Sequence, residues 1–220
     1  MNPALIILNP RQIPSCIQAI QGLGIPTCWL SNMTEPEAAK AANRQIRDTR
    51  YTHYAVLSDD TQPTRAALDL ILAATEDHPA VTGYCNLDEN EQRDIVNLTT
   101  NTLPPPPPRA SSYQFMTRGQ AENQGPLIPT TFAGLALTTL TRNLWLEHPL
   151  HVSANGGQMD YTLSHALAVH GIPIVAPNGA YVHHVKERWN SRDRHPLKQL
   201  LVGHEPPAIT WTSTEQKAAA

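Results

Sequence analysis

The sequence is poor in charged residues and cysteines, and it has no long hydrophobic run. Charged residues make up 16% of the 220 residues and hydrophobic residues 40%, which excludes a disordered chain of high charge and low hydrophobicity. No apolar stretch approaches the ~20 residues that span a bilayer, and residues 1–8 are too short for a signal peptide. Three widely spaced cysteines without a CxxC pair favour reduced thiols and a cytoplasmic location, in the host cytoplasm if the protein is viral.

Motifs that cradle phosphates through glycine backbone are missing as well. No GxGxxG follows the first apolar run, and no GxxxxGK[ST] occurs anywhere. The GxSxG motif of hydrolases is also absent, so a nucleophile elbow has no support. A phosphate-bearing ligand would therefore be neutralised most naturally by a metal ion. The net charge of −3 argues against a surface coated in basic charge for nucleic acid.

Proline, by contrast, is abundant, with 20 residues in the chain. Five of them are consecutive, at positions 104–108, and should adopt a polyproline II helix because proline lacks a backbone donor. This segment fits a stiff exposed connection; a docking site for an aromatic-lined partner is the alternative.

Short apolar runs alternate with helix-like segments four times in the first 85 residues. The runs at 4–8, 25–30, 54–57 and 80–84 predict strands, and Thr34, Pro36 and Glu37 form the start signal of a helix. Such alternation predicts a single compact α/β domain with a mostly parallel sheet and helices on both faces. Residues 86–129 read as a polar, proline-rich connection, 130–185 as a second half of the domain, and 186–220 as a basic C-terminal segment.

Candidate functional residues lie where the expected strands end, because ligands of open parallel sheets bind beyond those ends. Asp59 and Asp60 follow a buried strand directly, and adjacent carboxylates at such a place suit Mg²⁺ or Mn²⁺ that holds a diphosphate. An N-cap for the next helix is the alternative reading of this cluster. The other clusters lie at Asn9-Pro10-Arg11, at Ser31-Asn32 and around Asn86.

The order of these motifs resembles the inverting glycosyltransferases of the GT-A (Rossmann-like) fold, especially family 2. The stretches at 41–46 and 55–60 are similar to a helix and an acid-ended (DXD-type) strand of that family. The stretch from 156 to 160, followed by Gly171, Pro177 and 181–184, is similar to its acceptor-side acid and C-terminal histidine. Ser58 stands in place of the first acid of the DXD-type motif, and Met159 in place of the usual Glu before the catalytic acid.

The resemblance implies that residues 1–85 bind a nucleotide-sugar donor, expected to be UDP-linked, and that 130–185 bind a hydroxyl acceptor, either a glycan or a nucleic acid. It implies a metal held by Asp60 with His184 or His183, and Asp160 as the general base. A helix N-cap is the alternative for Asp160, and an ordinary strand-end pair for the histidines. The expected donor-binding residues are Asn9, Pro10, Arg11, Asn43, Arg44, Ser58, Asp59, Lys186, Arg188 and Trp189.

The basic segment after His184 also allows a solvated loop or a patch for anionic acceptors.

Three alternatives to ordinary glycosyl transfer stay open. The first is the same chemistry on a hydroxymethylated pyrimidine in viral (phage) DNA. The second is a sugar-1-phosphate nucleotidyltransferase, although its glycine- and arginine-rich N-terminal loop is missing. The third is a non-catalytic binding module that uses the proline segment.

Overall fold

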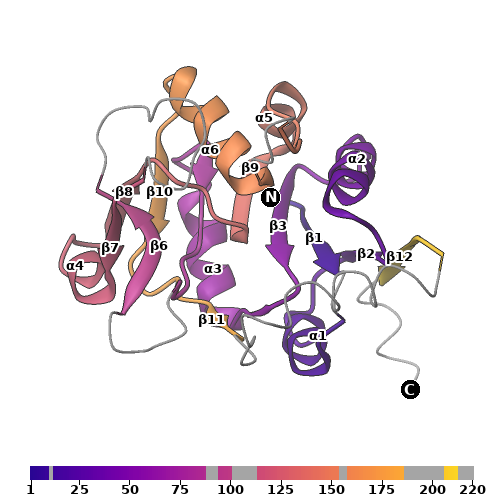
Figure 1. Cartoon of the computed structure of the whole chain (residues 1–220), viewed down its shortest axis with the longest axis horizontal. Coiled ribbons are helices and arrows are strands. Elements are labelled where there is room, and N and C mark those ends of the chain that lie inside the picture. Colours follow the sequence, from indigo (N-terminus) through magenta and orange to yellow (C-terminus); the bar gives the residue numbers. More distant parts are fainter. Residues whose placement is uncertain (10–11, 88–93, 101–112, 154–157, 186–205, 213–220) are drawn as a thin grey trace.

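An eight-stranded mixed sheet runs through the molecule in this computed structural model, which describes residues 1–9, 12–87, 94–100, 113–153, 158–185 and 206–212 (Figure 1). The strands are β1 (Pro3–Asn9), β2 (Thr27–Ser31), β3 (His53–Ser58), β5 (Ala80–Val81), β8 (Leu127–Thr130), β9 (Ala136–Thr141), β10 (Ile174–Pro177) and β12 (Ala208–Thr212). Their order across the sheet is β12-β2-β1-β3-β9-β5-β10-β8. Strands β12, β9 and β8 run antiparallel to their neighbours, and the others share one direction.

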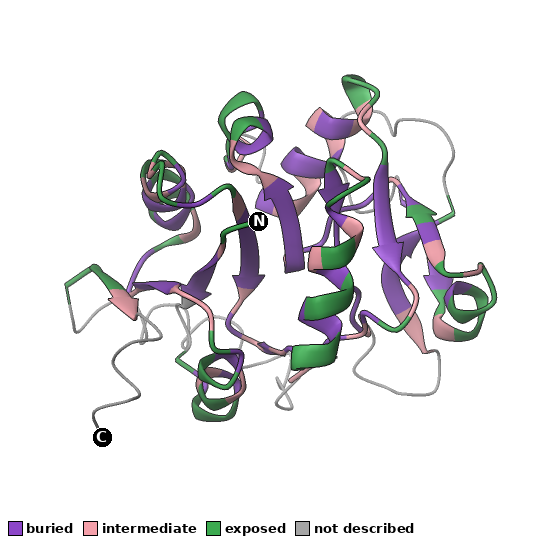
Figure 2. Cartoon of the chain, turned by 180° about the vertical axis from the view of Figure 1, so that it is seen from behind, coloured by how far each residue is buried: buried purple, intermediate pink, exposed green. Residues whose placement is uncertain are grey.

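Helices cover both faces of this sheet because side chains of a strand alternate between the faces. The helices are α1 (Pro14–Gln21), α2 (Glu35–Gln45), α3 (Arg65–Ala74), α5 (Arg142–Glu147) and α6 (Met159–Val169). In β1, Ala4, Ile6 and Leu8 pack with α2, α5 and α6, whereas Leu5 and Ile7 pack with α1 and α3. Most strands of the sheet are buried, the edge strand β12 is largely exposed, and the helices expose their outer sides (Figure 2).

The predicted α/β domain with a large sheet and helices on both faces is thus confirmed. Strands β1, β2 and β3 coincide with the apolar runs at 4–8, 25–30 and 54–57 to within a few residues. The start signal of α2 also forms as expected, since the carboxylate of Glu37 accepts hydrogen bonds from the backbone N–H and the hydroxyl of Thr34 at 2.9 and 2.7 Å. No helix in the described part of the chain is long and apolar enough to cross a membrane.

The stretch 86–129, expected as a connection, contributes regular structure of its own. It contains β6 (Ile95–Thr99), β7 (Phe115–Thr117), the short helix α4 (Arg118–Glu122) and the first residues of β8. The two strands pair with each other, and they pack with α4 over a small third hydrophobic cluster. The consecutive prolines at 104–108 lie outside the described residues.

Close contact between two segments of the sheet requires glycine at position 83. A Cβ atom added there would lie 2.4 Å from the backbone oxygen of Ala136 and 3.2 Å from that of Ala180. We expect Gly83→Ala to lower the free energy of unfolding by about 2 kcal/mol or more, because backbone atoms have to move. Gly119→Ala is the control, since nothing lies within 4 Å of its Cβ in α4 and alanine favours a helix. Urea unfolding of both variants measures the difference; equal stabilities would contradict the close packing.

Candidate active site

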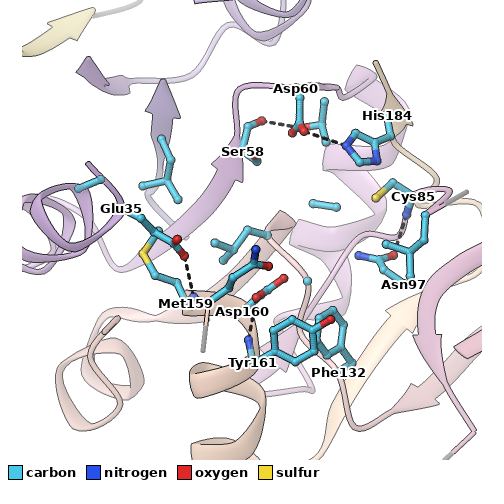
Figure 3. A pocket seen from close by; sticks show the side chains of 18 of the residues that line it. Glu35, Ser58, Asp60, Cys85, Asn97, Phe132, Met159, Asp160, Tyr161 and His184 are labelled. Carbon is cyan, nitrogen blue, oxygen red and sulfur yellow. Dashed lines mark hydrogen bonds and ion pairs between the residues drawn. The ribbon is translucent and has the colours of Figure 1, made fainter. Parts of the chain in front are cut away.

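A pocket of about 680 Å³ opens where β1 and β3 end, between the first turns of α2 and α6. Polar and aromatic side chains line much of it, among them Glu35, Ser58, Asp60, Cys85, Asn97, Phe115, Phe132, Asp160, Tyr161 and His184. Asp60 and His184 lie together on one side of the cavity, and Asp160, Tyr161 and Phe132 lie on another side (Figure 3). The topology therefore gathers four of the candidate residues, Ser58, Asp60, Asp160 and His184, from distant parts of the chain in one cavity.

A short antiparallel ladder brings His184 to Asp60. Strand β4 (Thr61–Gln62) follows Asp60 directly and pairs with β11 (His183–His184), with His184 opposite Thr61. The backbone N–H of Val185 donates to the backbone oxygen of Asp60 at 2.7 Å, which closes the ladder. Because side chains alternate along a strand, His184 faces the pocket, whereas His183 is exposed and is not among the lining residues.

Both ring nitrogens of His184 have oxygen partners. Nε2 lies 2.8 Å from Oδ2 of Asp60, and Nδ1 lies 2.9 Å from the backbone oxygen of Asn86. Burial by itself lowers the pKa of this histidine, but its hydrogen bonds with Asp60 and Cys85 outweigh burial and raise the pKa to about 10. Without a bound cation, the pair is therefore an imidazolium held against a carboxylate, both mostly buried.

The separation of this pair fits two neighbouring positions around a divalent cation. Ligand atoms about 2.1 Å from an octahedral ion and at right angles to each other are about 3.0 Å apart, and Nε2 and Oδ2 are 2.8 Å apart. Among the described residues, no group of three or more His, Cys, Asp and Glu side chains is placed to hold a metal ion. The remaining ligands would have to come from water or from a bound molecule such as a diphosphate.

Asp160 lies in the first turn of α6, one residue after the start of the helix. The N-cap is Gln158, so the alternative reading of Asp160 as the cap itself is wrong, although its Oδ1 accepts the N–H of Tyr161 at 2.8 Å. Burial, with a smaller contribution from the nearby Glu35, raises the pKa of Asp160 to about 6 against the lowering effect of backbone hydrogen bonds. A carboxyl group that titrates near neutrality at the wall of a cavity is typical of a general base.

Glu35 and an aromatic cluster border Asp160, and neither was predicted from the sequence. Oε1 of Glu35 accepts the N–H of Met159 at 3.0 Å. Phe115, Phe132 and Tyr161 line the pocket, and the Phe115–Phe132 and Phe132–Tyr161 ring centroids are 5.3 and 5.2 Å apart. Only their juxtaposition identifies these residues, since they come from α2, β7, the segment before β9 and α6.

Asp59 points away from the pocket and supports the loop after β1. Its side chain is almost completely buried, and Oδ2 accepts the backbone N–H of Gln12 at 3.0 Å. Gln12 in turn donates from Nε2 to Oδ1 of Asn32 at 2.8 Å, and both residues have left-handed φ angles of 53° and 56°. Strained backbone conformations of this kind gather at binding sites, and the two hydrogen bonds link Gln12, Asp59 and Asn32 into one network.

The remaining candidates divide into four groups. Ser58 lines the pocket at the end of β3. Asn43 and Arg44 lie in the last turn of α2, outside the residues that line the pocket; the side chain of Asn43 instead binds the backbone N–H and oxygen of Leu150 at 3.0 and 2.7 Å. Asn9 is the last residue of β1, and the others lie outside the described residues: Pro10, Arg11, Lys186, Arg188 and Trp189.

Comparison with known proteins adds one result about the fold. Neither a scan against protein-family models nor a search of curated proteins found a match. Among solved structures, the chain is similar to A197 from STIV, a virus protein of glycosyltransferase-like fold, with a TM-score of 0.52 and 14% identity. The match covers 86% of this chain and 96% of A197. At this identity the likeness concerns the fold alone: a mixed α/β domain with a large sheet and helices.

Proposed function

We propose that the chain is a metal-dependent, inverting glycosyltransferase of the GT-A fold that moves a sugar from a nucleotide sugar to a hydroxyl group. One observation carries the proposal: a single pocket holds the Asp60–His184 pair on one side and the Asp160 carboxyl, with a pKa raised to about 6, on another. The likeness to a glycosyltransferase-like fold supports it.

The donor side of the pocket needs a positive charge for a diphosphate. None of the described lining residues is Lys or Arg. Asp60 and His184 would hold Mn²⁺ or Mg²⁺, and this cation would stabilise the negative charge of the departing nucleoside diphosphate. Asn9, Ser58 and the basic residues after His184 stay predictions for donor binding.

Asp160 accepts the proton. As the acceptor oxygen bonds to the anomeric carbon, the bond to the diphosphate breaks, and the hydroxyl proton passes to the carboxylate of Asp160. Attack on the face opposite the leaving group inverts the anomeric centre. Glu35 and Asp160 make the acceptor side acidic, which favours an uncharged glycan hydroxyl over a phosphate-rich DNA acceptor.

A donor and acceptor screen tests the proposal. With Mn²⁺ and a panel of nucleotide sugars and glycans, we expect release of one nucleoside diphosphate, and NMR of the product should show an inverted anomeric centre. Release of pyrophosphate from a nucleoside triphosphate and a sugar 1-phosphate would instead identify a nucleotidyltransferase. No turnover of any donor in the presence of Mn²⁺ or Mg²⁺ would contradict the proposed reaction.

The rate should depend on pH through Asp160. A general base acts as the carboxylate, so we expect kcat/KM to rise about tenfold per pH unit below pH ~6 and to level off above it. The measurement is kcat/KM for the responsive donor between pH 4.5 and 8.5. A profile that is flat through pH 6 would contradict the role of Asp160 as the base.

A further inference from the structure

Glu35 lies at the start of one helix but binds the start of another. It is the first residue of α2, where Glu37, and not Glu35, binds Thr34 to complete the helix cap. Oε1 of Glu35 reaches α6 instead and accepts the backbone N–H of Met159 at 3.0 Å, across 124 positions of sequence. Glu35 is only partly buried, and it lines the same pocket as Asp160.

Carboxylates act as hydrogen-bond acceptors for backbone N–H groups in the first turn of α6. The N-cap residue Gln158 makes no side-chain cap hydrogen bond. Glu35 accepts the N–H of Met159, and Asp160 accepts the N–H of Tyr161. Two acidic side chains therefore share one helix N-terminus. This is the positive end of the helix macrodipole, so it reduces the repulsion between the two carboxylates.

We propose that Glu35 is the positioning residue for Asp160: its carboxylate fixes the first turn of α6 through Met159 and sets a second negative charge beside the Asp160 carboxyl at the pocket wall. This role rests on the function proposed above, in which Asp160 is the base. The charge of Glu35 makes Asp160 accept a proton more readily than an ordinary aspartate does, since a nearby like charge favours the neutral form of a carboxyl group.

Other groups around Asp160 do not supply this charge. Tyr161 on α6 and Tyr113 before β7 face it, and burial, together with Asp160 itself, raises the pKa of both phenols. They are therefore uncharged near neutral pH. The Asp60–His184 ion pair lies on another side of the pocket (Figure 3). Burial is the largest cause of the raised pKa of Asp160, and Glu35 is the one charged side chain that contributes to raising it.

The experiment titrates Asp160 in the full chain, without donor or acceptor, by NMR of ¹³C-labelled aspartate carboxyls. The signal is assigned by its absence in Asp160→Asn. Glu35→Gln keeps an oxygen for the Met159 N–H but removes the charge, and Glu35→Ala removes both. Glu37→Gln is the matched control, because Glu37 is two residues along the same helix, exposed and outside the pocket lining. A glutamine at this position can still complete the capping box.

We expect Glu35→Gln to lower the titration midpoint of Asp160 by about 0.5 pH unit or more, with little change in amide exchange of Met159. Glu35→Ala should lower the midpoint and also speed exchange of the Met159 amide at least about tenfold, whereas Glu37→Gln should change neither. If Glu35→Gln and Glu37→Gln give the same Asp160 midpoint, or if Glu35→Ala leaves Met159 protected, Glu35 does not position Asp160. Because no substrate is present, this result is independent of whether the chain transfers a sugar.

Discussion

Asp160→Asn is expected to abolish glycosyl transfer and at the same time to stabilise the folded protein. Removal of the general base should lower kcat by about 10² to 10⁴. The stability change follows from the pKa of Asp160, about 6 in the folded chain against 3.8 for an ordinary aspartate. Ionisation of Asp160 above pH ~4 therefore costs folding free energy, and the cost is complete above pH ~6. Asparagine avoids it and should add about 3 kcal/mol at pH 7.5.

Thermal and urea unfolding at pH 7.5 and pH 4 measure this effect. At pH 4 Asp160 is protonated in the folded state, whereas in the unfolded state it is about half ionised, so the advantage of the variant should shrink to about 0.5 kcal/mol. Asp77→Asn, at an exposed position, should leave activity and stability close to the wild type at both pH values. An active Asp160→Asn protein, or a variant that is less stable at pH 7.5 than at pH 4 relative to wild type, would contradict the assignment.

Asp60→Asn should cause the second large loss. The substitution removes a charged ligand for the proposed cation and leaves the buried His184 imidazolium without its carboxylate. Metal stabilisation of a leaving diphosphate contributes several kcal/mol, so we expect the rate of nucleoside diphosphate release to fall by about 10³ or more. Adding Mn²⁺ should not restore it.

Asp59→Asn is the comparison for this experiment, because its side chain faces Gln12 and not the pocket. An asparagine oxygen can still accept the Gln12 N–H, so this variant should retain its response to Mn²⁺. Equal loss of the Mn²⁺ response in both variants would place the cation elsewhere in the acidic cluster and would contradict a site made by Asp60 and His184.

Local sequence pattern predicted the elements that have strong local signals. The fully apolar run at 4–8 became the central strand β1, which is buried on both faces, and the Thr34–Glu37 signal began α2. Asp60 could be singled out because an acid after a buried strand lies where such a fold places its ligands, and Asp160 because the stretch 156–160 resembles the acceptor-side motif of family 2 glycosyltransferases. Their shared pocket with His184 follows from topology.

The parts that the sequence did not predict depend on contacts over long distances. In the sequence, Glu35 is an ordinary acidic residue at the start of a helix. Its hydrogen bond with the N–H of Met159 exists only because α6 packs next to α2. Strands β6 and β12 are five residues long and alternate apolar and polar residues only over their last four, and their partners β7 and β2 are brought to them by the fold. Asn43 was expected near the donor, but a helix that begins at the pocket carries its last turn away from it, so Asn43 holds Leu150 instead.

Calorimetric titration of the wild-type chain with nucleoside diphosphates, in the presence and absence of Mn²⁺, tests the central claim most directly. The account predicts that one member of a panel of UDP, GDP, ADP, CDP and dTDP binds with Mn²⁺, and that its affinity falls at least about tenfold without the cation. UDP is the first candidate. If no member binds in either condition, or if the affinity is the same with and without the cation, the pocket of Asp60, His184 and Asp160 is not a metal-dependent nucleotide-sugar site.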